Sequence, residues 1–169
     1  MPIPNIIQPE YIFIDDTLRL RKFDGVFAFA YPWYEDLDAM YLMDGERAAY
    51  PKERVERMYR YLDAHGELYF IEILDKGRFT PIGDVTFWQK DMPIIIGDSR
   101  YRGRGIGKKV IAALVQRGRD LGYDALFVDD IFHNNLASRR CFEVNGFTAY
   151  EETEKGSRYR LSLHTGETI

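Results

Sequence analysis

Residues 101–107 read Tyr-Arg-Gly-Arg-Gly-Ile-Gly and run directly into Lys108 and Lys109, and no other part of the chain says more about its fold. A glycine at every second position removes side chains from a tight turn, so backbone N–H groups can converge on one point. The next residues place apolar side chains on one helical face as far as Gly122. Because free N–H groups and the helix dipole favour negative charge at a helix N-terminus, we expect a phosphate-binding loop here.

The spacing of this loop excludes two common phosphate-binding motifs. A Walker A loop ending at Lys108 would need a glycine at position 102, which is an arginine, and a hydroxyl residue at position 109, which is a lysine. A dinucleotide fingerprint that starts at Gly103 or Gly105 would end on a lysine or a valine instead of a glycine. The basic residues of the loop are Arg100, Arg102, Arg104, Lys108 and Lys109.

Arg102, Gly105 and Gly107 instead form Arg-x-x-Gly-x-Gly, which resembles the pyrophosphate loop of the GNAT acetyltransferase superfamily, where it cradles coenzyme A. Residues 135–147 resemble the other signature of the family, an Asn, a helix and then Gly-Phe opening a strand. The resemblance is specific over roughly residues 92–150. It implies an α/β, GNAT-like fold, with a mixed, mostly antiparallel central sheet of six to seven strands flanked by about four helices, and residues 1–169 as one N-acetyltransferase domain.

Hydrophobic periodicity and turn residues predict an element order that agrees with this fold. Strands are expected at residues 17–24, 68–74, 82–88, 92–96, 125–128, 147–151 and 158–163. Helices are expected at residues 33–43 and 51–65, after the glycine loop, and after Asn135. Such an alternation is typical of an α/β protein with a mixed sheet.

Composition narrows the cellular context. The 169 residues suffice for one domain with a real core, and no stretch approaches the 18 apolar residues of a membrane span. The N-terminus lacks the features of a signal peptide, and the single Cys141 permits no internal disulfide, so we expect a cytoplasmic protein. We expect no membrane or metal partner. We also expect no nucleic-acid partner, because the basic patch is assigned to coenzyme A. A homodimer is left open.

The resemblance implies that the strand before the loop splays from its neighbour and pairs its free backbone groups with the pantetheine amides. One of these N–H groups would polarise the thioester carbonyl as an oxyanion donor. Gly97 departs from the family preference for a β-branched or aliphatic residue at this strand. The predicted coenzyme A-binding residues are Ile95, Ile96, Gly97, Arg102, Gly103, Arg104, Gly105, Ile106, Gly107, Lys108, Asn135 and Ser138.

Acetyl transfer to an amine needs an uncharged nucleophile, but an alkyl ammonium of pKa about 10.4 is neutral in roughly one molecule in 2,500 at pH 7. A carboxylate that takes the proton is therefore expected. Asp91 is the first candidate, because some GNAT enzymes carry a base about ten residues before the loop. Asp130 follows, where several small-molecule acetyltransferases hold an acidic substrate contact. Asp129 and Asp84 rank lower, and the alternative for each carboxylate is a solvated or turn-capping role.

Two features bear on the reaction and its acceptor. The family commonly has a Tyr seven residues after the helix-opening Asn, where this chain has Phe142, so the usual general acid is missing and Cys141, Tyr123 or water are weak substitutes. Outside the five loop cations the chain carries a net charge of about −9, which suits a cationic amine. Trp33, Tyr34 and neighbouring acidic residues would suit ammonium groups as well, although they also fit a helix packing stripe.

Three functions remain open at this point. The first is an acetyl-CoA-dependent N-acetyltransferase that acts by direct attack in a ternary complex on a small cationic amine, similar to an aminoglycoside or polyamine. The second is acetylation of a protein N-terminus or lysine, of the ribosomal-protein type. The third is a coenzyme A-binding regulatory module without turnover, which the absence of the usual tyrosine at Phe142 keeps open.

Overall fold

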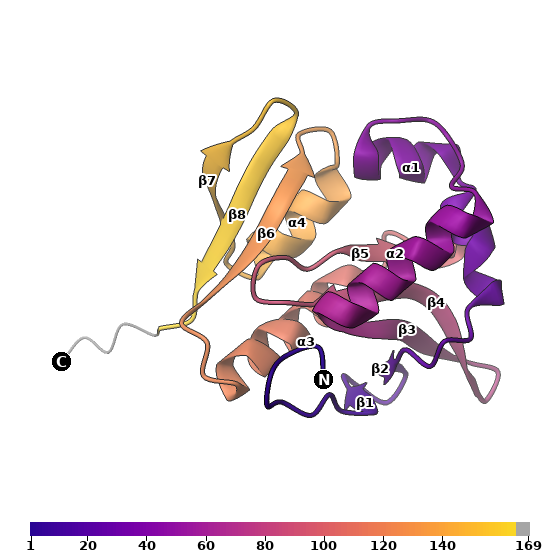
Figure 1. Cartoon of the computed structure of the whole chain (residues 1–169), viewed down its shortest axis with the longest axis horizontal. Coiled ribbons are helices and arrows are strands. Elements are labelled where there is room, and N and C mark those ends of the chain that lie inside the picture. The colour runs from indigo at the N-terminus through magenta and orange to yellow at the C-terminus, as the bar shows by residue number, and fades with distance from the viewer. Residues whose placement is uncertain (165–169) are drawn as a thin grey trace.

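The computed structural model describes residues 1–164 and divides the strands into two sheets that stand beside each other (Figure 1). The first sheet has the order β1 (Tyr11–Phe13), β2 (Leu18–Lys22), β3 (Glu67–Asp75), β4 (Arg78–Phe87) and β5 (Ile94–Ile96). The second has the order β6 (Ala125–Phe132), β8 (Gly156–Ser162) and β7 (Thr148–Glu152). Within residues 1–164, every pair of adjacent strands is antiparallel.

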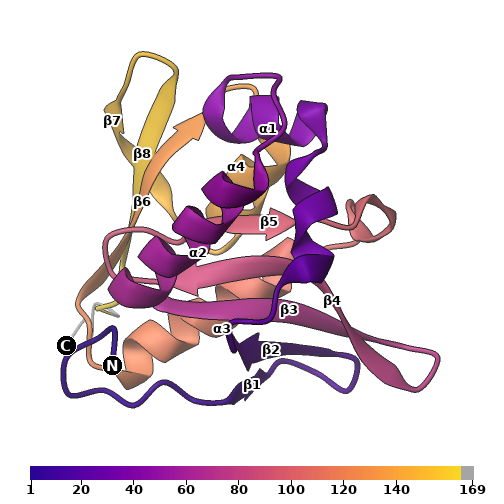
Figure 2. The same cartoon turned by 45° about the vertical axis from the view of Figure 1, so that its right-hand side comes forward.

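Helices cover both faces of the first sheet (Figure 2). The α-helices of the described residues are α1 (Leu37–Asp44), α2 (Lys52–His65), α3 (Ile106–Asp120) and α4 (Leu136–Val144). Two short 3₁₀ segments, η1 (Ala28–Tyr34) and η2 (Ser99–Tyr101), precede α1 and the glycine loop. Helix α2 lies on one face of the sheet and α3 on the other, and α4 packs beside α3. The predicted α/β fold class is confirmed.

Alternation along β3 explains why the sheet needs a helix on each side. Successive side chains of a strand point to opposite faces. Leu68 and Phe70 are fully buried in a cluster that contains the α2 side chains, whereas Tyr69 and Ile71 are fully buried in a second cluster with Leu114 of α3. The two cores therefore lie on opposite faces of the same strand.

The space between β5 and β6 is the feature that positions the site. Strand β5 ends the first sheet and β6 begins the second, so the two sheets separate here, as the resemblance implied. A few polar contacts from the segment between β4 and β5 hold β6 in place. The N–H of Phe127 donates to the carbonyl of Gln89 at 2.9 Å, and the N–H of Asp129 donates to Oδ1 of Asp91 at 3.0 Å.

Several element boundaries differ from the sequence predictions. The helix expected at residues 33–43 begins only at Leu37, because Pro32 lies inside the 3₁₀ segment and Asp36 caps the N–H of Ala39 at 3.1 Å. The strand expected at residues 92–96 is shortened to β5, while β6 continues past a bulge to Phe132. The short strand β1 was not expected. Within residues 1–164 no helix has the length and apolar character that a bilayer crossing requires.

Candidate active site

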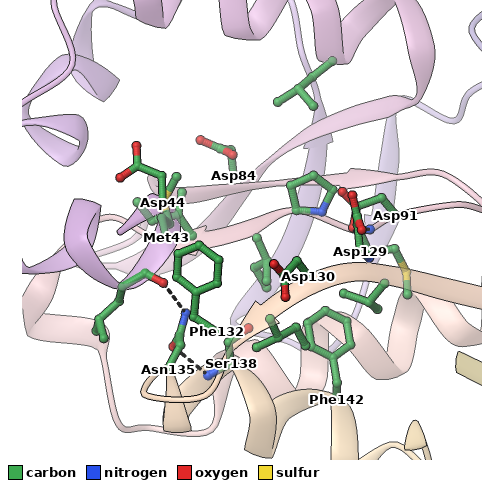
Figure 3. Close-up of a pocket in the computed structure, with 18 of the residues that line it drawn as sticks. Met43, Asp44, Asp84, Asp91, Asp129, Asp130, Phe132, Asn135, Ser138 and Phe142 are labelled. Atoms are coloured by element: carbon green, nitrogen blue, oxygen red, sulfur yellow. Dashed lines mark hydrogen bonds between the residues drawn. The ribbon is translucent and has the colours of Figure 1, made fainter. Parts of the chain in front are cut away.

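A pocket of about 420 Å³ lies where the two sheets separate, lined by α1, α2, β4, β5, β6 and α4. Five of its lining residues are aspartates, namely Asp44, Asp84, Asp91, Asp129 and Asp130. Within the described chain, no lysine, arginine or histidine lines it. Figure 3 shows Asp44 and Asp84 on one side of the pocket and Asp91 and Asp129 on the other. The pocket is therefore acidic from several elements at once.

Asp84 is the most buried of these carboxylates, with 3% of its surface exposed. Its Oδ2 accepts a hydrogen bond from the Tyr34 hydroxyl at 2.6 Å and another from the Tyr59 hydroxyl at 2.8 Å. Burial raises the pKa of Asp84 to about 6, and the two tyrosine hydrogen bonds act in the opposite direction. Burial likewise raises the pKa of both tyrosines, so both remain protonated donors.

Sequence reasoning ranked Asp84 low, because its partners are 50 and 25 residues away in the chain. Tyr34 ends η1, whereas Tyr59 lies in the middle of α2, and no short motif links either tyrosine to β4. One signal was available. An aspartate inside an otherwise apolar strand is rarely buried without a partner, and residues 82–88 form such a strand.

Asp91 lies in the pocket as the sequence predicted, close to β6. Its Oδ1 accepts two backbone hydrogen bonds, from Met92 at 2.9 Å and from Asp129 at 3.0 Å. Burial raises the pKa of Asp91, while these two hydrogen bonds lower it. One oxygen of Asp91 is thus committed to holding the two sheets together.

The other three aspartates are closer to water or to cations. Asp130 is exposed, and its Oδ1 accepts a hydrogen bond from the Thr153 hydroxyl at 2.7 Å. Asp129 pairs with Arg158 at 2.9 Å. Asp44, at the end of α1, pairs with an arginine of α2 at 3.3 Å and was not anticipated from the sequence. The structure therefore brings the predicted Asp91 and Asp130 into one pocket and adds Asp84 and Asp44.

The glycine loop has the geometry of an anion site. Gly103 and Gly105 have φ values of 72° and 77°, a region that favours glycine, and a Cβ on either would meet no heavy atom within 4 Å. Gly105 occupies the N-cap of α3 and offers no side-chain cap to the first N–H groups of the helix. The open backbone and these N–H groups fit the diphosphate of coenzyme A.

Most basic residues of the loop are already paired. Within the described part of the chain, three of the five contact carboxylates, in the pairs Arg100–Asp98 at 2.8 Å, Arg102–Asp36 at 2.9 Å and Lys109–Asp15 at 3.0 Å. Arg102 also donates to the carbonyls of Ile96 at 2.7 Å and Gly97 at 3.2 Å. This side chain ties β5 to the start of α1, a role that the sequence did not predict. Arg104 and Lys108 have no carboxylate partner among residues 1–164.

Two glycines near the loop are explained by close packing. A Cβ on Gly97 would lie 2.1 Å from Cγ of Trp33, so the indole fills the place of the aliphatic side chain that the family prefers. A Cβ on Gly107 would lie 2.8 Å from Sγ of Cys141, which marks a close approach of α3 and α4. Gly107 therefore serves helix packing, in addition to any role toward phosphate.

Asn135 caps α4 and joins it to α1. Its Oδ1 accepts the N–H of Ser138 at 3.2 Å, and its Nδ2 donates to the carbonyl of Leu42 at 3.3 Å (Figure 3). Asn135 and Ser138 line the pocket together with Ile95 of β5. Phe142 also lines the pocket, and it packs edge-to-face on Phe147 with ring centroids 5.3 Å apart.

The suggested substitutes for the missing tyrosine do not reach this pocket. Neither Cys141 nor Tyr123 is among its lining residues. Burial raises the pKa of the Cys141 thiol, which makes it a weaker proton donor. The ring of Tyr123 stacks on Phe87 at 6.2 Å, inside the core on the α3 face. Neither Cys141 nor Tyr123 therefore supplies the proton that the family tyrosine would donate in this pocket.

Several solved structures share this fold. A domain from Methanocaldococcus jannaschii superimposes with a TM-score of 0.77 at 17% identity, covering 88% of this chain and 100% of that one. The aminoglycoside acetyltransferase AAC(6')-Ib, in complex with ribostamycin and coenzyme A, gives 0.68 at 18% identity over 91% of this chain and 100% of that one. A Salmonella typhimurium acetyltransferase that modifies the N-terminal serine of ribosomal protein L7/L12 gives 0.67 at 17% identity over 92% and 100%.

Sequence comparison agrees at the level of the family. No curated protein sequence matches the chain significantly. Residues 30–147 match the family described as the acetyltransferase (GNAT) family, which is well over half of the chain. The protein therefore belongs to the acetyltransferase (GNAT) family, as the glycine loop and the segment after Asn135 predicted, and it is an N-acetyltransferase with acetyl-CoA as its donor.

Proposed function

We propose that the protein acetylates a primary amine of a small cationic molecule, by direct attack in a ternary complex with acetyl-CoA. The observation that carries this proposal is the acidic pocket beside β5, with five aspartates and, within residues 1–164, no basic lining residue. Asp129 and Asp44 have arginine partners, but Asp84, Asp91 and Asp130 have none among the described residues. The uncompensated negative charge favours a cation over a neutral or anionic acceptor.

In this proposal the chain binds the donor on one side of the space between β5 and β6 and the acceptor on the other side. The N–H groups of residues 103–107 bind the diphosphate, and Arg104 and Lys108 add positive charge. The free edge of β5 pairs with the pantetheine, while Asn135 and Ser138 lie at the acyl end. A carboxylate of the pocket takes the proton, for which the sequence favours Asp91, and Asp130 attracts the cationic acceptor.

The donor half is tested by replacing Gly105 with valine and titrating coenzyme A by calorimetry. A side chain at this position strains the backbone and enters the space that the phosphates would occupy, so we expect binding to weaken more than tenfold. Gly25→Val is the matched control, because Gly25 has a similar φ of 83° and equally open surroundings. Affinity within about threefold of wild type for Gly105→Val would show that the diphosphate binds elsewhere.

The acceptor half is tested by thiol release from acetyl-CoA with a panel of amines. The panel contains spermidine, an aminoglycoside, a neutral primary amine at the same pH and a peptide with a free N-terminal serine. We expect the highest kcat/KM for the polycations, falling as salt screens the pocket. The peptide represents the protein N-terminal alternative, since a protein of similar fold modifies an N-terminal serine. A higher kcat/KM for the peptide than for the polycations would show that the acceptor is a protein N-terminus and not a small cationic amine.

A further inference from the structure

The geometry points to Asp84 as the catalytic residue that binds the acceptor ammonium and takes its proton, held in place by Tyr34 and Tyr59. This inference rests on the proposed function and makes it specific. It assigns proton transfer to a buried residue of β4 that the sequence ranked low. In this inference the two tyrosines orient one oxygen of the carboxylate and leave the other oxygen free.

The hydrogen bonds around Asp84 are one-sided. Both tyrosine hydroxyls donate to Oδ2, at 2.6 and 2.8 Å. Among the described residues no side-chain donor reaches Oδ1, and this oxygen is not among the fully buried atoms that lack a partner, so it keeps access to the pocket that Asp84 lines. The free oxygen is thus available to a donor that enters the pocket.

The charge of Asp84 also lacks a partner. A buried carboxylate is normally paired with a cation, because desolvation of an unpaired charge is costly. The titratable groups around Asp84 are Tyr34 from η1 and Tyr59 from α2, with Asp44, Asp91, Asp129 and Asp130 as the other acidic groups of the pocket. Its cross-strand neighbours, Phe70 on β3 and Ile95 on β5, are apolar. A cation from solution is the compensating charge that this arrangement lacks.

Asp84 is well placed relative to the expected thioester. It is directly opposite Ile95 in the antiparallel register, and paired residues on one face have Cβ atoms roughly 5 Å apart. Ile95 packs in the same cluster as Tyr34 and Tyr59, so its side chain and that of Asp84 share the α2 face. An amine bound to Asp84 would therefore lie about one side chain from β5. Asp91, by contrast, already uses Oδ1 for two backbone N–H groups.

The proposed step is balanced in protons and electrons. The ammonium transfers one proton to Oδ1 of Asp84 and becomes a neutral amine. Its lone pair then forms the C–N bond with the acetyl carbonyl carbon, the C–S bond breaks, and the thiolate takes the second proton from nitrogen. Asp84 returns its proton to water through the pocket, so the net products are an amide, free coenzyme A and one proton.

The test compares Asp84→Asn with wild type, using spermidine as the acceptor probe. We expect kcat to fall at least 100-fold at pH 7, spermidine binding to weaken at least tenfold by calorimetry, and the affinity for coenzyme A to stay within twofold. In the apo protein, infrared difference spectra should show a carboxyl group that titrates near pH 6 in wild type and is missing in the variant. Glu56→Gln is the matched control, because Glu56 also accepts a tyrosine hydrogen bond, from Tyr31 at 3.0 Å, but lies outside the pocket.

The outcomes separate this inference from the proposed function. If wild type acetylates the peptide or the neutral amine but neither spermidine nor the aminoglycoside, the acceptor class is wrong, and the same variant is measured with the amine that is acetylated. If Asp84→Asn retains activity within threefold at pH 7 while Asp91→Asn loses it, Asp91 is the base and the inference is overturned. Should Asp84→Asn fail to fold, Tyr59→Phe is measured instead, because it keeps the carboxylate and removes a hydrogen bond that lowers the pKa of Asp84. The acidic limb of the pH profile of kcat/KM must then move to higher pH. An unmoved limb also overturns the inference.

Discussion

Glu67 and Asp84 are both buried carboxylates on neighbouring strands of the first sheet, yet their surroundings differ. Glu67 opens β3 and receives two hydrogen bonds from Arg117 of α3, at 2.6 and 2.8 Å, and one from the Tyr69 hydroxyl at 3.0 Å. Asp84 receives two phenol hydroxyls on one oxygen and no cation. The first arrangement cancels the charge and uses both oxygens. The second leaves negative charge and a free oxygen beside a pocket.

Glu72 shows that pairing with arginine is the general solution in this sheet. Its two oxygens accept from Arg19 at 2.8 Å and from Arg21 at 3.0 Å, both on the adjacent strand β2. Among the described residues the buried acids are Glu67, Glu72 and Asp84, so Asp84 is the exception. In this sheet the two carboxylates paired with arginine are neutralised within the fold, whereas Asp84 lines the proposed acceptor pocket without a cation among the described residues.

The largest effect is expected when the arginine of the structural pair is removed. Arg117→Met leaves Glu67, which has no exposed side-chain surface, buried without its cation. Breaking such a pair costs about 3 to 5 kcal/mol, which urea denaturation at pH 7 would measure as a lower free energy of unfolding. Arg119→Met, on an exposed position of the same helix, is the control and should change stability by less than about 0.5 kcal/mol. A loss below about 1 kcal/mol for Arg117→Met would contradict the structural role.

The next effect concerns the pH dependence of stability at Asp84. Its pKa is raised from 3.8 to about 6 in the folded state, so its contribution to stability is fully present below pH 3.8 and is lost as pH rises through 6. A shift of about two units corresponds to about 3 kcal/mol. The amide of Asp84→Asn does not ionise, so this variant does not lose stability in that way. Its free energy of unfolding relative to wild type should therefore rise by about this amount between pH 4 and pH 7. Denaturation at both pH values measures it, with exposed Asp63→Asn as control, and a constant difference would exclude the raised pKa.

The sequence predicted the glycine loop and the cap of α4, but not the contacts around Asp84. The glycine loop and Asn135 are local signals, because the spacing within a few residues determines a loop, a cap and a helix start. The contacts of Asp84 are not local, since the two tyrosines reach it only after η1 and α2 have folded over the sheet. The role of Arg102 was also hidden, because its partner Asp36 is 66 residues away.

The same distinction holds for the fold. Long periodic elements such as α2 and α3 were predicted to within a few residues, because their apolar stripes are strong. The start of α1 was predicted four residues too early, because the apolar spacing continued into η1 and the Asp36 cap was not recognised as a boundary. Strand β5 is short because Pro93 and the turn that includes Asp91 replace its first residues, which alternation alone cannot reveal.

A smaller effect separates the tyrosines of the two buried acids. Tyr59→Phe removes one of two bonds to Asp84, so we expect a loss of about 1.5 to 3 kcal/mol at pH 7 and a smaller loss at pH 4, where Asp84 is protonated. Tyr69→Phe leaves Glu67 with both arginine bonds, so its loss at pH 7 should be smaller, about 1 kcal/mol. A loss for Tyr59→Phe that is no larger at pH 7 than at pH 4 would show that Asp84 does not change its charge between these two pH values.

The smallest effect is expected at Asp130, a carboxylate of the same pocket that is exposed to water. Its attraction for a cation is screened, so Asp130→Asn should weaken the apparent affinity by about 0.5 to 1 kcal/mol, a two- to fivefold rise in KM for spermidine, with kcat unchanged. Raising the salt concentration should shrink the difference in KM, since salt screens the attraction of Asp130 in wild type and the variant already lacks it. If kcat falls instead while KM stays constant, Asp130 takes part in the chemical step. Burial would then not distinguish the catalytic role of Asp84 from the role of Asp130.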